Sequence, residues 1–116
     1  MKRFNNHLIG VDQGDAVIFA EFETGGDMWT GEGARERRRA ITFSRPFKSD
    51  PAVQVSISLW DVYPAAALRA ELVAENVTCE GCDIVFRTWS DTRVARIRAG
   101  WTAIGELPHD DDWEIS

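Results

Sequence analysis

Alternation of apolar and polar residues over residues 82–105 constrains the fold of this chain more than any other feature. A period of two is the signature of β-strands with one buried face. The expected inward residues are Ile84 and Phe86 in the first half and Ile97, Ala99, Trp101 and Ala103 in the second. Ser90 and Asp91 interrupt the rhythm. They predict a turn at residues 89–93 that joins two strands as an antiparallel pair.

Further short alternating segments predict an all-β fold class. Strands are expected at residues 16–23, 37–44, 52–61 and 69–78, separated by glycine- and proline-containing segments that include a loop at 28–33. Within the third strand, the residues expected to point inward are Val53, Val55, Ile57 and Leu59. Six short strands predict an antiparallel β-sandwich over residues 16–105. Residues 1–15 are expected to form an irregular lead-in, and residues 106–116 an acidic surface tail.

Composition excludes several classes of protein. The 116 residues suffice for one domain whose core needs no metal or disulfide. A net charge of −6 argues against nucleic-acid binding. No apolar run approaches the roughly 20 residues that span a bilayer, so membrane insertion is not expected. The N-terminus lacks the run of about 7 to 15 apolar residues of a secretory signal. The default expectation is therefore a cytoplasmic protein, with release or association with a particle as alternatives.

The residues with reactive side chains do not form a recognisable catalytic or metal site. Cys79 and Cys82 match a C-x-x-C pattern, but no second pair follows, so one cysteine is expected in the core and one in a turn. His109 and the acidic run at 110–112 are expected to be solvated rather than to bind a metal. Both histidines lie near the termini, which disfavours a Ser-His-Asp arrangement. We expect neither an enzyme nor a cofactor.

Trp89 is a large ring at the end of a strand, next to polar turn residues. A sugar offers a C–H face to an aromatic ring and hydroxyls to charged groups that hydrogen-bond in pairs. Arg69 at the start of another strand and the acidic loop around Glu32 could supply those groups. Spacing alone does not bring the three together. The alternative is a Trp89 ring packed over a neighbouring strand and an Arg69 in a surface ion pair.

Five segments in order carry a resemblance to a known family: I-T-F-S-R-P-F at 41–47, P-A-V-Q-V-S-I-S-L-W-D-V at 51–62, L-R-A at 68–70, G-C-D-I-V-F-R-T-W-S-D-T-R-V at 81–94 and G-W-T-A-I at 100–104. Together they resemble the H-type lectin domain, a family that includes a snail agglutinin and the C-terminal domains of discoidins. The resemblance implies a six-stranded β-sandwich that assembles as a parallel homotrimer. It also implies a non-catalytic lectin of the cell-adhesion type, which binds N-acetylgalactosamine or galactose-type glycans at subunit boundaries.

The resemblance also implies roles for individual residues. The binding arginine falls on Arg69, the stacking tryptophan on Trp89, and the loop acid, contributed by an adjacent subunit, on Glu32. Flanking positions fall on Thr30, Gly31 and Ser90. The second aromatic contact of the family falls on Ala95, which removes a wall of the pocket. The disulfide of the snail protein would fall on Lys48 and Phe86, so that bridge is absent here, in agreement with a reducing compartment.

Trimerisation also has a physical argument in the sequence. Val73 and Val85 lie on strand faces opposite Leu72, Ile84 and Phe86, so a neighbouring subunit is expected to cover the second apolar face. Pairing of trimers into hexamers is left open. The rival hypothesis is a structural trimeric module of a larger particle, of the phage or tail-fibre type, with little or no sugar binding.

Overall fold

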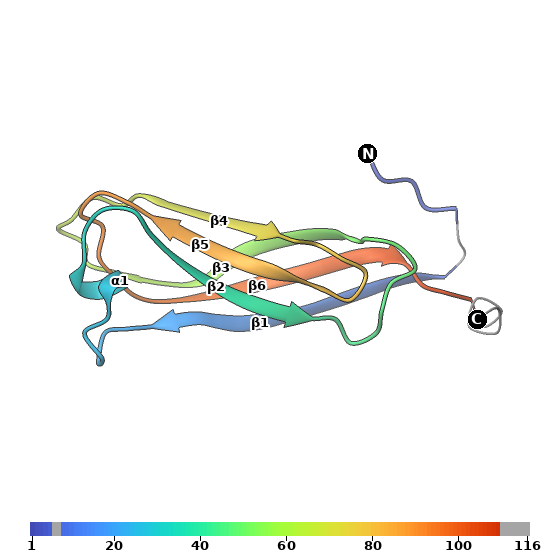
Figure 1. Ribbon diagram of the computed structural model, residues 1–116, viewed down its shortest axis with the longest axis horizontal. Helices are drawn as coiled ribbons and strands as arrows, with labels where there is room; N and C mark the ends of the chain where they lie inside the picture. Colours follow the sequence, from blue (N-terminus) through green and yellow to red (C-terminus); the bar gives the residue numbers. More distant parts are fainter. Residues whose placement is uncertain (6–7, 110–116) are drawn as a thin grey trace.

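Six β-strands and one helical turn make up the fold in the computed structural model, which describes residues 1–5 and 8–109. The elements follow the chain as β1 (Ile9–Ala20), α1 (Asp27–Thr30), β2 (Arg35–Thr42), β3 (Ala52–Val62), β4 (Ala70–Glu75), β5 (Gly81–Thr88) and β6 (Val94–Glu106). The predicted all-β class with antiparallel strands is confirmed. Figure 1 shows the strands running along one long axis, with α1 at one end.

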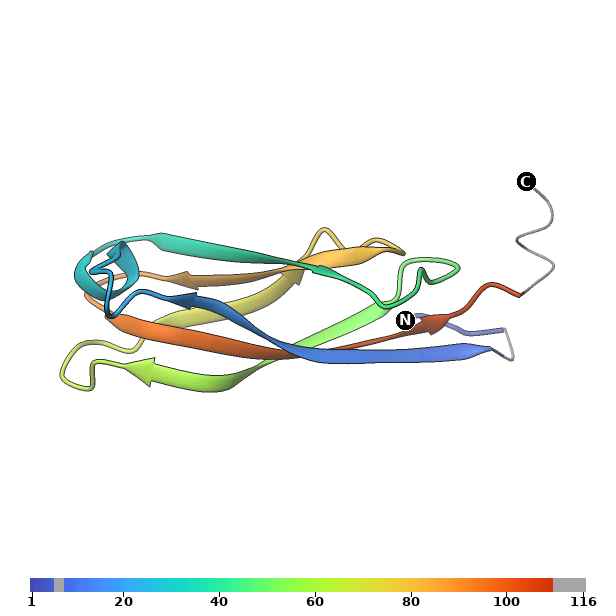
Figure 2. The same cartoon turned by 90° about the horizontal axis from the view of Figure 1, so that it is seen from below.

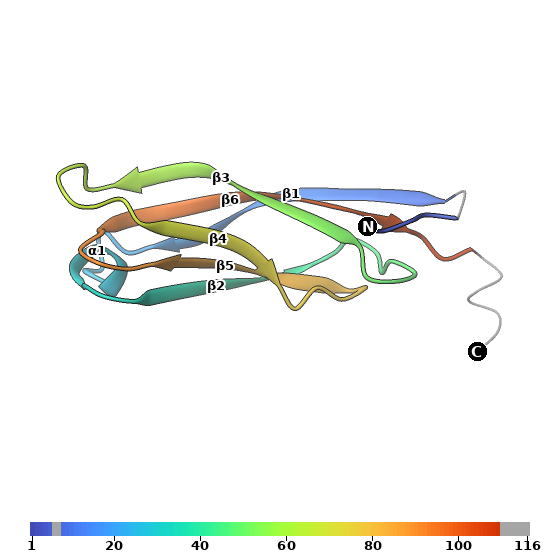
Figure 3. The same cartoon turned by 90° about the horizontal axis from the view of Figure 1, so that it is seen from above.

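The strands form two three-stranded antiparallel sheets, ordered β1–β6–β3 and β2–β5–β4. Figures 2 and 3 show the sheets as two layers. β5 and β6 are the central strands of different sheets, so the predicted pairing of these two strands is wrong. Residues 89–93 cross between the layers instead of forming a hairpin. Their carbonyl groups bond to other loops: Ser90 accepts from the N–H of Gly33, and Arg93 from the N–H of Tyr63, both at 2.9 Å.

The facing surfaces of the two sheets form the core. Every residue expected to point inward from β5, and all but the half-buried Trp101 from β6, is fully buried. The Phe86 ring lies at the centre, with its centroid 5.5 Å from that of Phe19 and 6.0 Å from that of Trp60. Burial of one such ring stabilises the fold by about 1.5–3 kcal/mol. A second cluster, nearer the start of β1, contains Phe43, Phe47, Cys82 and Ala103.

A β-bulge in β3 changes the face that its second half presents. The register shifts between Ile57 and Leu59, so that Leu59 aligns with the outward Arg98. The prediction that Leu59 points inward is therefore wrong. Trp60 aligns with the buried Ile97 and packs its ring against Phe86, with 38% of the residue exposed. An inserted residue reverses the alternation, and a strict period of two cannot reveal it.

β1 begins at Ile9, so the irregular lead-in predicted for residues 1–15 is wrong from that residue onward. Glycines in β1 hide its periodicity because large side chains from elsewhere lie over them. A Cβ on Gly14 would lie 3.0 Å from the indole nitrogen of Trp101, and one on Gly10 would lie 2.8 Å from Leu107. At these two positions, the side chains of Trp101 and Leu107 occupy the space that a side chain on β1 would fill. The C-terminal boundary also moves, since β6 continues to Glu106.

A charged network covers the outer face of the β2–β5–β4 sheet. Arg87 in β5 donates to Glu36 and Glu75 at 2.7 Å and to Glu71 at 3.2 Å. Hydrogen bonds from Arg87 hold the pKa values of Glu36 and Glu75 below their ordinary range, with Arg38 adding to the effect.

The same network removes one argument for assembly. Arg38 in β2 lies opposite Val85 and reaches across β5 to Glu75 at 2.8 Å, so its side chain passes over Val85. Val85 has no exposed surface in the single chain. Val85 therefore offers no exposed apolar surface that a neighbouring subunit would need to cover, and it gives no support to the predicted trimer.

Cys82 is buried in the second core cluster and Cys79 lies in the β4–β5 turn, as predicted. Both thiols are free, and burial raises the pKa of Cys82. Within residues 1–5 and 8–109, no helix is long and apolar enough to cross a bilayer. The same residues contain no group of three or more His, Cys, Asp or Glu that could hold a metal ion. Residues 110–116, which carry most of the predicted acidic tail, lie outside the described residues.

Candidate functional site

Three loops meet at the end of the sandwich that holds α1: residues 21–34, 63–69 and 89–93 (Figure 1). Every residue singled out as a binding residue belongs to one of them. Because β4, β5 and β2 are neighbours in one sheet, the ends of these strands bring the loops together.

Arg69 and Trp89 are neighbours across two adjacent strands. The last ladder pair between β4 and β5 is Ala70 with Thr88. Arg69 directly precedes Ala70, and Trp89 directly follows Thr88, so both lie just beyond the end of the ladder. The Thr88 hydroxyl donates to the Arg69 carbonyl. The Arg69 N–H donates to the hydroxyl of Thr92 at 3.0 Å. The fold therefore brings together the two residues that sequence spacing left apart.

The Trp89 side chain is open to solvent. It is 43% exposed and lines a hollow of about 360 Å³. The rest of the lining is Ala34, Arg35, Glu36, Glu71, Arg87 and Thr88. The ring is thus accessible from the outer face of the β2–β5–β4 sheet rather than sealed in the core, a requirement of the sugar-stacking hypothesis.

The segment that carries Glu32 lies on the other side of Trp89. The Gly33 N–H donates to the Ser90 carbonyl at 2.9 Å, which fixes this segment beside residues 89–93. Glu32 itself is exposed. Trp89 therefore has Arg69 on one side and the Glu32 segment on the other, within a single chain.

Residues 28–33 are more ordered than the predicted loop. Residues 27–30 form one helical turn, α1, which is anchored by a Met28 side chain with no exposed surface. The Thr30 hydroxyl donates to the carbonyls of Gly25 and Gly26 at 3.0 and 3.1 Å. A Cβ on Gly31 would lie 2.6 Å from the Asp27 carbonyl oxygen. Thr30 and Gly31 therefore shape the loop, with the threonine hydroxyl already engaged.

Ser90 and Ala95 differ in what they contribute. Ser90 is exposed and adopts a left-handed backbone conformation with φ of 64°, which L-residues rarely do. Ala95 lies in β6 and is 3% exposed. It lines a separate hollow beside Phe22 and Arg96, not the one around Trp89. Within one chain, the alanine at this position therefore removes no wall from the Trp89 hollow.

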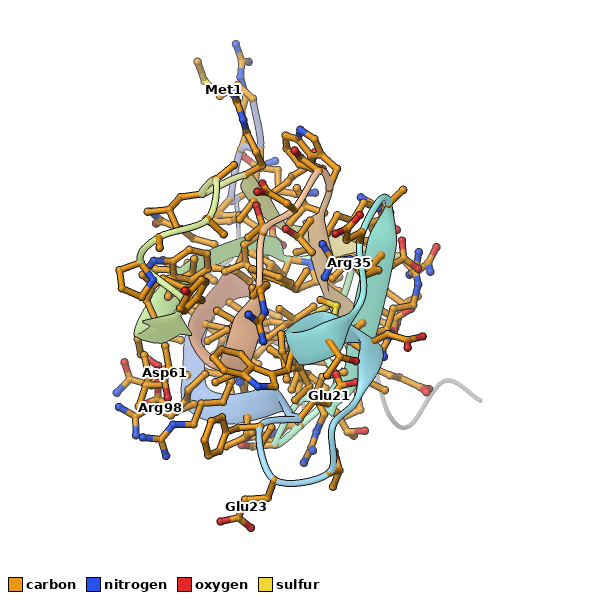
Figure 4. All side chains as sticks on the ribbon, turned by 90° about the vertical axis from the view of Figure 1, so that its left-hand side faces the viewer. Met1, Glu21, Glu23, Arg35, Asp61 and Arg98 are labelled. Atoms are coloured by element: carbon orange, nitrogen blue, oxygen red, sulfur yellow. The ribbon has the colours of Figure 1, made fainter. Side chains whose placement is uncertain are left out.

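Sequence reasoning missed two arginines at this end. Arg35 at the start of β2 donates to backbone carbonyls of both the α1 loop and residues 89–93. Arg93 lies between two rings, 4.8 Å from the centroids of Trp29 and Tyr63, and donates to the Trp29 carbonyl at 2.9 Å. Figure 4 looks onto this end and shows Arg35 beside the helical turn, on the opposite edge from Asp61 and Arg98. The one available signal was alternation in β2, which places Arg35 on the inward face.

The electrostatic environment of Arg35 agrees with these contacts. Burial lowers the pKa of Arg35, while the carboxylates of Asp27 and then Glu32 oppose that shift. Glu32 thus lies close enough to Arg35 to influence it. Chemically, the site offers an aromatic face, a guanidinium on one side and a carboxylate on the other. These groups can stack on a C–H surface and exchange hydrogen bonds with hydroxyls.

Comparison with known proteins gives three findings. The sequence pattern of the H-type lectin domain matches residues 38–104. A protein of Fuscovulum blasticum named ATP synthase subunits region ORF 7 is 50% identical over 107 residues, which are 92% of this chain and 93% of that protein. Recombinant discoidin II of Dictyostelium discoideum is similar in structure, with a TM-score of 0.75 and 25% identity, over 94% of this chain and 40% of that chain.

This chain thus spans well under half the length of discoidin II. The tailspike protein gp49 of Pseudomonas phage LKA1 is similar over 86% of this chain and 15% of its own, with a TM-score of 0.55 and 13% identity. At that identity the likeness shows a shared fold alone.

Proposed function

The chain belongs to the H-type lectin domain family, and on that premise we propose that it is a non-catalytic carbohydrate-binding protein. Its ligands are N-acetylgalactosamine or galactose-type residues of glycans, bound at the subunit interfaces of a homotrimer. Trp89 stacks on the sugar, Arg69 donates to its hydroxyls, and Glu32 of an adjacent subunit accepts from them. Ser90, Gly31 and Thr30 border the site.

One observation carries this proposal: Trp89 is 43% exposed in a hollow, and it directly follows Thr88 in the ladder pair whose other member, Ala70, is directly preceded by Arg69. An exposed indole beside a guanidinium is what a sugar face and its rim of hydroxyls require. The Glu32 segment, hydrogen-bonded to Ser90, brings a carboxylate to the same end of the sandwich.

Exposed apolar side chains on the other sheet support the trimer. Val11 and Ile104 form a directly opposed pair on the outer face of the β1–β6–β3 sheet, 64% and 38% exposed. Val17 on the same sheet is 49% exposed. A neighbouring subunit that covers this face would remove these side chains from water. A trimer with several weak sites would raise avidity for a multivalent glycan by about 10²–10⁴-fold where the spacing fits.

A glycan array at high protein density tests the proposal. Wild-type protein should bind glycans that end in N-acetylgalactosamine or galactose, and Trp89→Ala and Arg69→Ala should reduce that signal to background. Phe22→Ala is the matched control, because Phe22 is a 60% exposed ring at the same end that does not line the Trp89 hollow. Equal background signals from wild type and both site variants would overturn the assignment.

The rival hypothesis, a structural module of a larger particle, predicts a different outcome in the same preparation. It expects a stable trimer with no response to any saccharide. The fold shared with a phage tailspike protein is compatible with either function. The array therefore separates the two.

A further inference from the structure

Arg35 connects the two segments on either side of the site. The three nitrogens of its guanidinium donate to five backbone carbonyl oxygens. These belong to Gly33 at 3.0 Å, Asp27 at 3.1 Å, Met28 at 3.4 Å, Ser90 at 3.2 Å and Thr92 at 2.7 Å. Three of these carbonyls belong to the α1 loop and two to residues 89–93. One side chain thus holds both segments by their backbones.

Both segments are short and irregular, so their backbones depend on contacts with side chains from elsewhere. α1 has four residues, and a helix that short is not stable alone. Within α1 the Asp27 carbonyl accepts from the Gly31 N–H at 2.7 Å, and Arg35 adds donors to that carbonyl and to the carbonyl of Met28. In the facing segment, Ser90 holds an unfavourable backbone conformation, and its carbonyl accepts from both Gly33 and Arg35. These contacts keep the residue next to Trp89 in place.

We propose that Arg35 is a positioning residue of the carbohydrate sites. It holds the Trp89 segment, which serves one site, in a fixed position relative to the Glu32 segment that the same chain contributes to the site of an adjacent subunit. This inference rests on the proposed function. Arg35 acts through the backbone of the two loops, and its own donors are taken up by their carbonyls.

The geometry of the guanidinium explains why arginine stands here. It presents donors in a planar fork, whereas the lysine ammonium is a compact point charge with three donors. Lysine at position 35 would keep the positive charge but could not reach carbonyls of both segments at once. If the ordered arrangement were then populated about one tenth of the time, the apparent Kd for a saccharide would rise about tenfold.

The test compares Arg35→Lys with a matched control in the same strand. Arg37 lies two residues further along, on the same face of β2, and makes a forked contact with the Glu21 carboxylate at 2.7 and 3.0 Å. Arg37→Lys should therefore disturb a similar contact without touching residues 27–33 or 89–92. Hydrogen exchange by mass spectrometry and titration with N-acetylgalactosamine on the full chain supply the two readouts.

In Arg35→Lys, we expect faster exchange in both segments together, including the Gly33 amide, while the sheet amides stay protected and the apparent Kd rises about tenfold. Arg37→Lys should leave the exchange of both segments and the Kd unchanged. Unchanged exchange in Arg35→Lys, a rise in only one segment, or a rise without loss of affinity would each overturn the proposal. If wild type binds no saccharide, the proposed function fails instead, and the exchange data alone then decide whether Arg35 couples the loops.

Discussion

The backbone N–H of Arg69 donates to the hydroxyl of Thr92 at 3.0 Å, and that hydroxyl in turn donates to the carbonyl of Ala67 at 2.6 Å. Thr92 has no exposed surface. A single buried hydroxyl thus joins the end of the β3–β4 loop to the crossover between the sheets. The position of Arg69 relative to Trp89 depends on it.

Thr92→Val replaces that hydroxyl with a methyl group of similar size and removes the partner of two part-buried backbone groups, the Arg69 N–H and the Ala67 carbonyl. We expect a loss of about 1–3 kcal/mol in the free energy of unfolding, measured by urea denaturation. Saccharide affinity should fall as well, since the main chain at Arg69 loses its anchor. Thr102→Val, in β6 away from the site loops, should change stability by less than about 0.5 kcal/mol. Equal effects of the two substitutions would contradict this role of Thr92.

Arg93→Ala removes a guanidinium that lies between the rings of Trp29 and Tyr63 and donates to a main-chain carbonyl. Because two cation–π contacts and a charged hydrogen bond are removed, the free energy of unfolding should fall by about 2 kcal/mol. Arg96→Ala serves as the control, because Arg96 is 57% exposed and pairs with the similarly exposed Asp61. This substitution should lower the free energy of unfolding by less than about 1 kcal/mol. Urea midpoints measure both variants. A loss no larger in Arg93→Ala than in the control would count against the stacking contribution.

Ser90 has a left-handed backbone, with φ of 64°. Glycine adopts this conformation without a steric penalty, whereas a β-branched residue is strongly disfavoured there. Ser90→Gly should leave the thermal midpoint unchanged or raise it. Ser90→Val should destabilise the protein by about 1–2 kcal/mol. Differential scanning calorimetry gives the thermal midpoints of wild type, Ser90→Gly and Ser90→Val. A Ser90→Val midpoint as high as that of Ser90→Gly would show that the backbone of Ser90 is not strained.

The network on the β2–β5–β4 sheet predicts a dependence of stability on pH. The folded protein holds the pKa values of Glu36 and Glu75 below their ordinary 4.5, so the unfolded chain takes up protons first on acidification. Their contribution is present above pH 4.5 and is lost as the pH falls through the lower folded values. Urea midpoints from pH 6 to 3 should decline less steeply in Glu75→Gln. Glu80→Gln, in the β4–β5 turn outside the network, should keep the wild-type slope; matching slopes in all three proteins would refute the linkage.

Mixed trimers test which chain supplies the acid. Glu32→Gln and Trp89→Ala homotrimers should each fail to bind. If the two residues of one site come from adjacent subunits, trimers refolded from a mixture of both chains recover some intact sites, and binding returns on the array. If both residues come from one chain, no mixture contains an intact site. Absence of recovery in verified mixed trimers would place the whole site within one protomer.

The sequence predicted which face of a strand is buried better than which strands are neighbours. Alternation in β5 and β6 identified the inward Ile84 and Ile97 because a period of two reports the face directly. It carries no information about the partner strand, so two central strands of opposite sheets were paired with each other. The sequence also does not predict the bulge before Leu59 or the strand through Gly14. Both depend on the neighbouring strand β6, through its register with β3 in the first case and through the Trp101 side chain in the second.

The sequence indicates which side chains of the candidate site could meet a sugar, but it does not indicate which residue supports them. Trp89 and Arg69 stood out because an exposed ring and a fork of donors are typical of sugar recognition. Arg35 did not stand out, because its partners are main-chain carbonyls that the fold brings together from positions up to 57 residues away. Such a contact leaves no pattern in the order of residues.

The first strand begins and the last strand ends side by side, with Ile9 paired to Glu106, at the opposite end of the sandwich from α1 (Figure 1). Anything tethered there, whether a linker, a fluorophore or a sensor surface, projects away from the indole. Copies of this protein immobilised through that end would therefore present α1 and Trp89 away from the support.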